Sequence, residues 1–223
     1  LLDWLALEFV ENGWSIKHLH RVILMSSTYR LASTADDSAL AVDPTNRWYW
    51  RFDRRRLDAE AIRDGILQAT GALDAGRPGG HPFPPESTWK FSQHGPFKAT
   101  YQSSHRSVYL MTQRIQRHPF LALFDGADPS RVTAQRKTTA VALQALYLRN
   151  SPFIHRQSEI LAQKLIDSFT DPRQRVEIAM RRTWSRQPTA DEIDAALHYV
   201  DQFGTQLKQD SDPLATRIQP QLV

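Results

Sequence analysis

The chain has 223 residues, of which 41% are hydrophobic and 23% are charged, and it contains no cysteine. These values are typical of a globular protein that needs no covalent cross-link for its stability. The lack of cysteine excludes disulfides, zinc–thiolate sites, iron–sulfur clusters, thiol nucleophiles and a C-x-x-C-H haem attachment within this sequence. The apolar run Val22–Met25 is much shorter than the roughly 20 residues that cross a bilayer, so we expect no membrane-spanning helix.

The net charge of +4 is distributed unevenly along the chain. Arginine supplies 22 of the 28 basic residues, and its planar fork suits paired contacts with carboxylates or phosphates. Residues 47–63 hold six arginines and three acids, whereas residues 191–212 hold six acids and one lysine. A basic middle and an acidic end predict internal ion pairs as readily as a surface that binds an anion.

The first 46 residues predict a pair of helices followed by a loop. Apolar side chains at positions 2, 5, 6, 9 and 10 share one helical face, and Gly13 ends this helix. Ser15 is placed to cap a second helix, whose apolar stripe starts at Ile16. Residues 32–46 are rich in Ser, Thr, Asp and Ala, which favours a surface loop.

The middle of the chain predicts two extended segments around a helix. Residues 47–54 alternate between aromatic and charged side chains, which predicts a strand with Trp48, Trp50 and Phe52 on its buried side. A helix is expected from Asp58 to Gly71, and the Gly- and Pro-rich residues 75–87 predict a long irregular loop. Residues 101–114 predict a second extended ribbon.

The rest of the chain is predicted to be helical. Helices are expected over residues 119–124 and 138–150. Ser151-Pro152 and Asp171-Pro172 each predict the start of a further helix, because proline suits the first helical position. The segment Thr189–Glu192 has the capping-box pattern that begins a last helix.

Together these elements predict a mainly α fold, namely an irregular helical domain with a small β ribbon and a C-terminal helical bundle. We expect a single helical domain over residues 1–223, with a sub-division near residues 75–100 at the Gly- and Pro-rich loop. Because the sequence opens on a helical pattern without Met, we expect it to be a piece of a larger protein.

Three carboxylates are candidates for acid–base chemistry. Glu60 and Asp64 lie one turn apart on the predicted helix with Arg63 beside them, and Asp125 lies in a turn. The same helical spacing is common in surface ion-pair networks, and Asp in a turn commonly accepts local backbone hydrogen bonds. We favour these structural roles, and acid–base chemistry is the alternative.

No metal site is predicted. His18 and His20 are two residues apart, so on a helix their side chains point about 200° apart and do not share one ion. The other histidines show no ligand spacing such as H-E-x-x-H, and no serine lies in a G-x-S-x-G nucleophile motif.

Five arginines are candidates for binding an anion or a partner: Arg54, Arg55, Arg56, Arg63 and Arg106. The first three follow an aromatic run, as they would in a platform that stacks nucleic-acid bases or sugar rings. Because the alternation places those rings on the buried side of a strand, we favour a structural role and expect nucleic acid to be the least suitable partner. The expected arrangement is an arginine fork that ties a loop to a helix through carboxylates.

Several segments resemble one known family in the same order along the chain. They include Leu1–Ala6, Phe9–Ser15, Lys17–Arg21, Ser27–Arg30, Arg54–Asp64, Asp128–Pro129, Asn150–Phe153 and Pro188–Thr189. Together they are similar to the planctomycete-type domain of unknown function 1553, and the resemblance covers nearly the whole chain. It assigns no catalytic residue.

The resemblance implies a context for the chain. Its relatives are C-terminal domains of exported bacterial proteins that also carry cytochrome-c-like domains. We therefore expect an extracytoplasmic domain, in the periplasm or cell envelope, that forms the C-terminal part of its protein. Haem c would then belong to an N-terminal region of the parent protein, and we expect no cofactor in this chain.

These observations lead to two functional hypotheses. The favoured one is a non-enzymatic interaction or scaffolding domain, whose partners are other domains of the same protein or an anionic polymer or polysaccharide. The alternative is a carbohydrate-active or hydrolase-like domain that uses Glu60, Asp64 or Asp125. A deep pocket holding two carboxylates with perturbed pKa values would favour the alternative.

Overall fold

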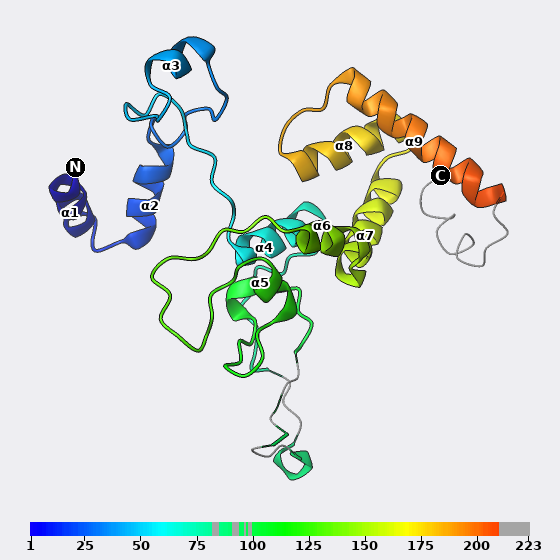
Figure 1. The fold of residues 1–223 in the computed structure, drawn as a ribbon, viewed down its shortest axis with the longest axis horizontal. Coiled ribbons are helices and arrows are strands. Elements are labelled where there is room, and N and C mark those ends of the chain that lie inside the picture. The colour runs from blue at the N-terminus through cyan, green and yellow to red at the C-terminus, as the bar shows by residue number, and fades with distance from the viewer. Residues whose placement is uncertain (82–84, 91–93, 96, 98–99, 210–223) are drawn as a thin grey trace. The chain divides into compact units, whose positions relative to one another are not determined.

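The computed structural model describes residues 1–81, 85–90, 94, 95, 97 and 100–209 (Figure 1). Its contacts divide the chain into two compact units, Leu1–Arg56, here called the N-terminal unit, and Leu57–Val223, here called the C-terminal unit. The expectation of one domain over residues 1–223 stays a prediction. No helix in the described part of the chain combines the length and the apolar character needed to cross a membrane.

The N-terminal unit begins with the predicted pair of helices, α1 (Leu2–Glu11) and α2 (Ile16–Met25). Gly13 has a φ of +67°, a left-handed conformation that glycine adopts without steric cost, and this reverses the chain between the helices. The Ser15 hydroxyl accepts a hydrogen bond from the His18 backbone N–H at 3.2 Å, as expected for an N-cap. His18 Nε2 also lies 2.8 Å from Glu8 Oε1, which ties α2 to α1.

The expected loop over residues 32–46 contains a short helix, α3 (Asp37–Val42), so the loop prediction is wrong there. The Asp36 carboxylate accepts a hydrogen bond from the Ala39 backbone N–H at 3.0 Å. This bond satisfies one of the amide groups that the first turn of a helix leaves without a partner. The local cap therefore outweighs the polar, turn-like composition of the segment.

Residues 47–54 contain a turn at residues 47–48 and a bend at residue 51, and the strand predicted there is wrong. The Asp43 carboxylate accepts hydrogen bonds from the backbone N–H groups of Arg47 and Trp48, at 3.0 and 2.8 Å. Trp50 Nε1 donates to the Asp43 carbonyl at 2.9 Å. These bonds wind the chain around Asp43 and leave Trp48 76% exposed, so this ring does not fill a core.

The C-terminal unit contains the remaining helices. They are α4 (Ala59–Ala69), α5 (Pro119–Leu123), α6 (Ala142–Asn150), α7 (Pro152–Ser168), α8 (Pro172–Trp184) and α9 (Ala190–Gln209), with the short 3₁₀ turns η1 (Glu86–Thr88) and η2 (Ser107–Tyr109). The mainly α prediction is confirmed. The start of α6 at Ala142 is later than the predicted residue 138, and Thr139 is instead held by a carboxylate, as described below.

An aromatic core joins the first part of this unit. Ala59 of α4 packs with Leu110, Phe120, Leu121 and Phe124, all of them buried. The Phe120 and Phe124 rings are 4.6 Å apart and stacked. A second, smaller cluster formed by Leu161, Leu165 and Ile178 joins α7 to α8. The two clusters bury the apolar stripes of α4, α5, α7 and α8.

Residues 101–114 contain η2 instead of the expected extended ribbon. Within the described residues there is no strand, and the nearest approach to a sheet is one isolated bridge between Asp74 and His105. The small β ribbon is therefore a wrong prediction. Backbone groups of residues 103–107 pair with side chains of α4 in place of a second strand.

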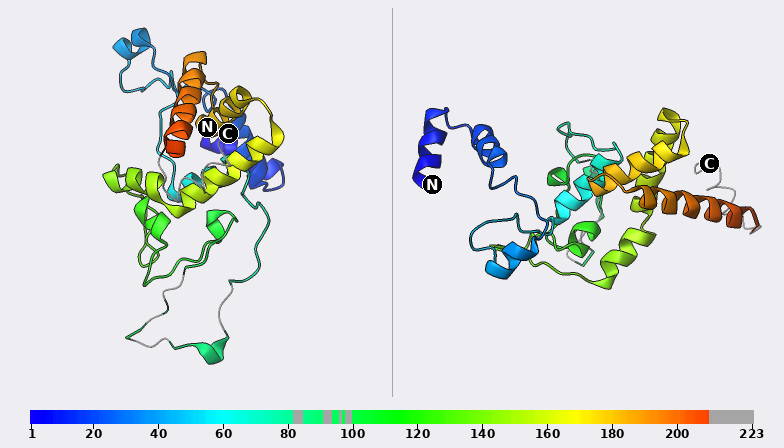
Figure 2. Two further views of the ribbon diagram at one scale, coloured as in Figure 1. Left: turned by 90° about the vertical axis from the view of Figure 1, so that its right-hand side faces the viewer. Right: turned by 90° about the horizontal axis from the view of Figure 1, so that it is seen from above.

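Both predicted proline-led helices, α7 and α8, are confirmed. Ser151 accepts from the Phe153 backbone N–H at 3.2 Å to cap α7, and Asp171 accepts from Arg173 N–H at 3.0 Å to cap α8. In both helices proline occupies the first turn, where no hydrogen-bond donor is missed. Helices α8 and α9 then lie side by side (Figure 2).

The predicted capping box at the start of α9 is also confirmed. Glu192 Oε2 accepts from the Thr189 backbone N–H at 2.8 Å, and Glu192 N–H donates to Thr189 Oγ1 at 3.3 Å. Arg186 makes a two-pronged contact with the same carboxylate, at 2.6 and 2.8 Å. These hydrogen bonds, that from Arg186 first, lower the pKa of Glu192 from 4.5 to about 2.

The capping box gives a pH-dependent prediction. A carboxyl whose pKa is depressed in the folded state stabilises that state above its unfolded pKa, and the stabilisation disappears as the pH falls towards 2. We expect Glu192→Gln to lower the melting temperature at pH 7 and to lower it less and less between pH 4.5 and pH 2. Thermal unfolding followed by circular dichroism measures this difference. A difference that stays constant across this range would contradict the assignment.

Two glycines give opposite predictions for the same substitution. Gly65 lies exposed in the middle of α4, and a Cβ atom there would meet nothing within 4 Å. We expect Gly65→Ala to raise the free energy of unfolding by about 0.5–1 kcal/mol, because alanine favours helix.

A Cβ atom on Gly126 would lie 2.7 Å from the Leu121 carbonyl oxygen. We expect Gly126→Ala to lower the free energy of unfolding by about 1–3 kcal/mol, measured by urea titration.

Candidate functional site

Arg63 of α4 is a buried anchor that holds residues 103–107 against the helix. Its side chain is only 3% exposed. Nη1 donates to the His105 carbonyl and to Ser107 Oγ, each at 3.1 Å, and Nη2 donates to the Ser103 carbonyl. The guanidinium therefore supplies donors to a segment that has no partner strand. An anion-binding role for this candidate would require those contacts to break.

Asp64 completes the same arrangement from the next position of α4. One carboxylate oxygen, Oδ1, accepts from the Ser107 backbone N–H at 2.8 Å and from Ser107 Oγ at 2.6 Å. The same oxygen lies 3.7 Å from Arg63 Nη1. Burial lowers the pKa of Arg63, and the charge of Asp64 opposes that shift. We call Arg63, Asp64 and Ser107 the α4 clasp.

Glu60, one turn earlier on α4, is bound to a different arginine. Arg136 Nη1 donates to Glu60 Oε2 and also lies 3.9 Å from Asp58 Oδ1. Burial raises the pKa of Glu60, but the hydrogen bond and positive charge of Arg136 outweigh it and leave this pKa below its ordinary value. A general acid at neutral pH needs the opposite shift. Glu60 is thus ionised and neutralised by its neighbour.

Asp125 closes the turn after α5. Its backbone has a φ of +63°, and its carboxylate accepts from the Thr139 backbone N–H at 2.8 Å and from Thr139 Oγ1 at 2.9 Å. Gln144 holds the same region by donating from Nε2 to the Leu123 carbonyl at 2.9 Å. Asp128, three residues later, accepts from the Ser130 backbone N–H at 2.9 Å, a local bond typical of Asp in a turn.

His118 is a titratable group near the clasp for which the sequence motifs gave no role. Burial lowers the pKa of His118, and the positive charge of Arg63 lowers it further. Its Nδ1 is buried and has no hydrogen-bond partner. His105 Nδ1 lies 3.4 Å from Asp74 Oδ2. Among the described residues, no three His, Asp or Glu side chains gather in a way that would hold a metal ion.

The five candidate arginines fall into different environments. Arg54, Arg55 and Arg56 are exposed at the end of the N-terminal unit. Arg106 is exposed in the C-terminal unit, where Arg63 is buried in the clasp. Arg63 therefore already has an internal function, whereas the other four present their side chains at the surface.

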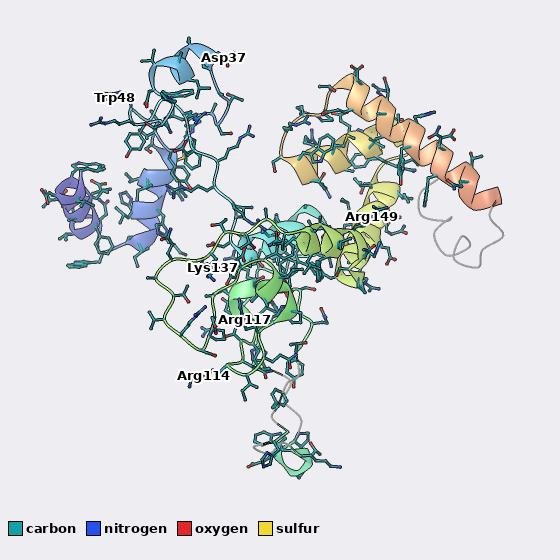
Figure 3. All side chains as sticks on the ribbon, in the orientation of Figure 1. Asp37, Trp48, Arg114, Arg117, Lys137 and Arg149 are labelled. Carbon is teal, nitrogen blue, oxygen red and sulfur yellow. The ribbon has the colours of Figure 1, made fainter. Side chains whose placement is uncertain are left out.

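The loops around α5 carry a basic surface that the sequence analysis did not single out. Residues 101–150 contain seven Arg or Lys and two Asp, and both Asp accept hydrogen bonds within the chain. Arg114 and Lys137 are exposed there (Figure 3). Arg117 donates to the Gly126 carbonyl. The excess of basic over acidic residues in residues 101–150 is the sequence feature that would have indicated this surface.

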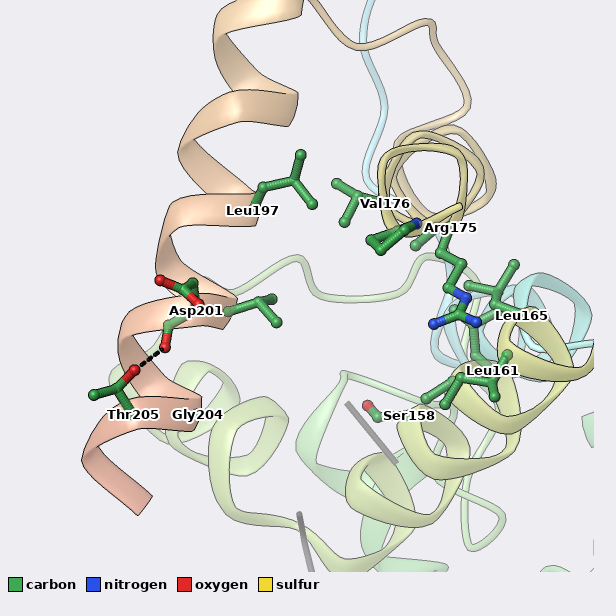
Figure 4. A pocket seen from close by; sticks show the side chains of 14 residues that line it. Ser158, Leu161, Leu165, Arg175, Val176, Leu197, Asp201, Gly204 and Thr205 are labelled. Atoms are coloured by element: carbon green, nitrogen blue, oxygen red, sulfur yellow. Dashed lines mark hydrogen bonds between the residues drawn. The ribbon is translucent and has the colours of Figure 1, made fainter. Parts of the chain in front are cut away.

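A cavity of about 650 Å³ lies among α7, α8 and α9 (Figure 4). Leu161 and Leu165 of α7 face Leu197 of α9 across it, and Val176 of α8 joins them. The lining is mostly apolar, and Asp201 adds a carboxylate from α9. It does not bring together any of Glu60, Asp64 and Asp125, so it offers no paired carboxylates of the kind that the enzymatic hypothesis requires.

A second cavity, of about 510 Å³, lies where α4 and α7 meet residues 102–104. Arg156 and Gln157 of α7 contribute polar groups to it, and the motif analysis missed both residues. One signal was present. Gln157 occupies the position one turn before Leu161 and two turns before Leu165, so it is a polar residue on an otherwise apolar, buried stripe.

The comparison with family models identifies the chain. Residues 1–200 match the model described as PSD1, Protein of unknown function (DUF1553). The chain belongs to this family. The resemblance that the sequence motifs indicated is thereby confirmed. No curated protein and no solved structure matches the chain.

The clasp of this DUF1553 domain gives a testable prediction. We expect Arg63→Ala to lower the free energy of unfolding by about 3 kcal/mol, because it leaves buried carbonyl groups without donors and Asp64 without its cation. Arg106→Ala is the matched control, because Arg106 is exposed, and we expect a change within about 0.5 kcal/mol. Urea unfolding followed by circular dichroism measures both. Equal effects of the two substitutions would contradict a structural role for Arg63.

Proposed function

We propose that the chain is a non-enzymatic interaction domain of an extracytoplasmic bacterial protein, and that its partner is another domain of that protein. The proposal rests on one observation above the others. The N-terminal unit has no buried hydrophobic side chain, although α1 and α2 are rich in apolar residues. A unit without a hydrophobic core of its own needs another surface to cover its apolar face.

The exposed apolar side chains lie on both helices of the pair. On α1 they include Leu2, Trp4, Leu7 and Val10, and on and beside α2 they include Trp14, Ile16, Leu24 and Met25. The Glu8–His18 bond joins the two helices, and Phe9 of α1 contacts the Trp14 ring in the connecting turn, but none of their apolar side chains is buried. The hydrophobic effect therefore favours a state in which this face is covered.

A domain of the same protein is the partner that fits this surface best. Interfaces that stay closed are more hydrophobic than those that open and close, and the face of α1 and α2 is mainly apolar. A covalent connection raises the effective concentration of such a partner, so that modest affinity suffices. The cytochrome-c-like domains expected from the resemblance, with their haem c, are the partner domains that we propose.

The engaged carboxylates also favour an interaction domain over a hydrolase-like one. Glu60 is paired with Arg136, Asp64 accepts from Ser107, and Asp125 accepts from Thr139. An acid–base pair needs one carboxylate with a raised pKa and one that is free to attack or to activate water. The pKa of Glu60 is lowered instead.

Hydrogen exchange in the full-length parent protein tests the proposal. We expect backbone amides of α1 and α2 to exchange at least about tenfold more slowly in the parent than in this chain alone, because the partner domain shields them. Amides of α7 serve as the internal reference and should exchange equally in both. Equal exchange of α1 and α2 in the two proteins would overturn the proposal.

A pair of substitutions separates the interface from general effects of charge. Leu7→Asp places a carboxylate on the exposed apolar face of α1, and we expect it to abolish the added protection in the parent protein. Val132→Asp makes the same change at an exposed residue of the C-terminal unit, and we expect the protection to remain. Loss of protection in both variants would contradict an interface formed by α1 and α2.

A further inference from the structure

The cavity of about 510 Å³ between α4, α7 and residues 102–104 has the features of a binding site for a small polar molecule. Its volume falls within the roughly 300–1,000 Å³ of ordinary ligand sites. We propose that it binds a carboxylate-bearing sugar, such as a uronic acid unit. This inference does not depend on the proposed interface, because that interface involves only α1 and α2.

Leu67 and Phe153 contribute apolar side chains to the wall of the cavity. Leu67, on the inner face of α4, is almost completely buried, and Phe153 lies at the start of α7. The Phe153 ring is held by an edge contact with Phe120 at 5.9 Å and by the Arg63 guanidinium at 5.7 Å. Such a wall offers a fixed apolar surface to the C–H groups of a sugar ring.

Gln157 is the polar group that most clearly indicates a ligand. It is only 7% exposed, and its Oε1 accepts from Thr70 Oγ1 at 2.8 Å. Within the described residues this is the one hydrogen bond of the Gln157 side chain, and its amide nitrogen donates none. This nitrogen is not among the buried polar atoms that lack a partner, so it is open to the cavity that Gln157 lines, where a ligand hydroxyl can accept a hydrogen bond from it.

Arg156, the residue before Gln157, supplies the only charge in the described lining. Its side chain is exposed and forms no ion pair or hydrogen bond within the described residues. The planar guanidinium fork matches a carboxylate through two parallel hydrogen bonds. The lining has no Asp or Glu to compete for it. The first turn of α7, at Pro152, adds the positive end of a helix dipole.

The opposite side of the cavity is formed by Gln102, Ser103 and Ser104. This segment is fixed before any ligand arrives, because Arg63 donates to the Ser103 carbonyl and the Asp74 backbone N–H donates to the Ser104 carbonyl at 2.9 Å. The backbone of Ser103 and Ser104 is thereby held beside the cavity, and Gln102 precedes it in the lining. Preformed polar groups lower the entropic cost of binding.

The combination of groups selects among ligand classes. A neutral sugar would leave Arg156 without its anion, and a simple anion would leave Gln157 and the apolar wall unused. One carboxylate, several hydroxyl groups and an apolar ring face together match all three features. None of the surface arginines expected to bind an anion lines this cavity, so it is a separate site.

Titration calorimetry of the purified chain with galacturonate tests the proposal. We expect saturable binding with 1:1 stoichiometry, and binding of galactose and of acetate that is at least about tenfold weaker, since each lacks half of the recognised groups. Galactose binding as tight as galacturonate binding would overturn the role of Arg156. Acetate binding as tight as galacturonate binding would overturn the recognition of a sugar.

Two matched arginine variants locate the binding site. Arg156→Gln removes the charge from the cavity, and we expect it to weaken galacturonate binding at least about tenfold. Arg149→Gln removes an exposed arginine that does not line the cavity, and we expect less than a twofold change. Both variants keep the fold, because both side chains are exposed. No binding by the unaltered chain, or equal weakening by the two variants, would overturn the proposal.

Discussion

The buried guanidinium of Arg63 is the interaction on which the C-terminal unit depends. It satisfies carbonyl groups of residues 103 and 105 that would otherwise need a partner strand, while Asp64 satisfies the amide of Ser107. The aromatic core, the polar cavity and the path of the chain from α4 to α5 all require this segment to stay in place. Here the side chains of the α4 clasp form the backbone hydrogen bonds that a neighbouring strand would form in a sheet.

Local signals in the sequence predicted most of the helices correctly. Predictions were wrong where contacts between distant segments determine the backbone conformation. Ser15, Asp171 and the Thr189–Glu192 box cap their helices as expected, because a cap involves only residues within one turn. The two predicted extended segments failed for the opposite reason. Asp43 winds residues 47–50 into turns, and α4 holds residues 103–107 from about 40 positions away.

For the candidate residues, too, the sequence did not reveal contacts between residues that are far apart along the chain. Arg136 pairs with the Glu60 carboxylate, whereas the Arg63 guanidinium donates mainly to backbone carbonyl groups and lies 3.7 Å from Asp64. The partner of Glu60 was not foreseeable, because Arg136 lies 76 residues along the chain. The polar cavity was missed because Gln157 and Gln102 meet only in space. The only local sequence feature that indicated the cavity was Gln157, a polar residue on the buried stripe of α7.

Gln157 also separates the two hydrophobic clusters of the C-terminal unit. On α7 it lies between Phe153, which packs on the aromatic cluster, and Leu161, which belongs to the cluster shared with α8. Apolar contact along the helix is interrupted at that turn. At the same turn Gln157 is hydrogen-bonded to Thr70 at the end of α4, and α8 also contacts α4 directly, so polar and helix–helix contacts join the two clusters there. One amide side chain thus marks the turn of α7 at which packing passes from one hydrophobic cluster to the other.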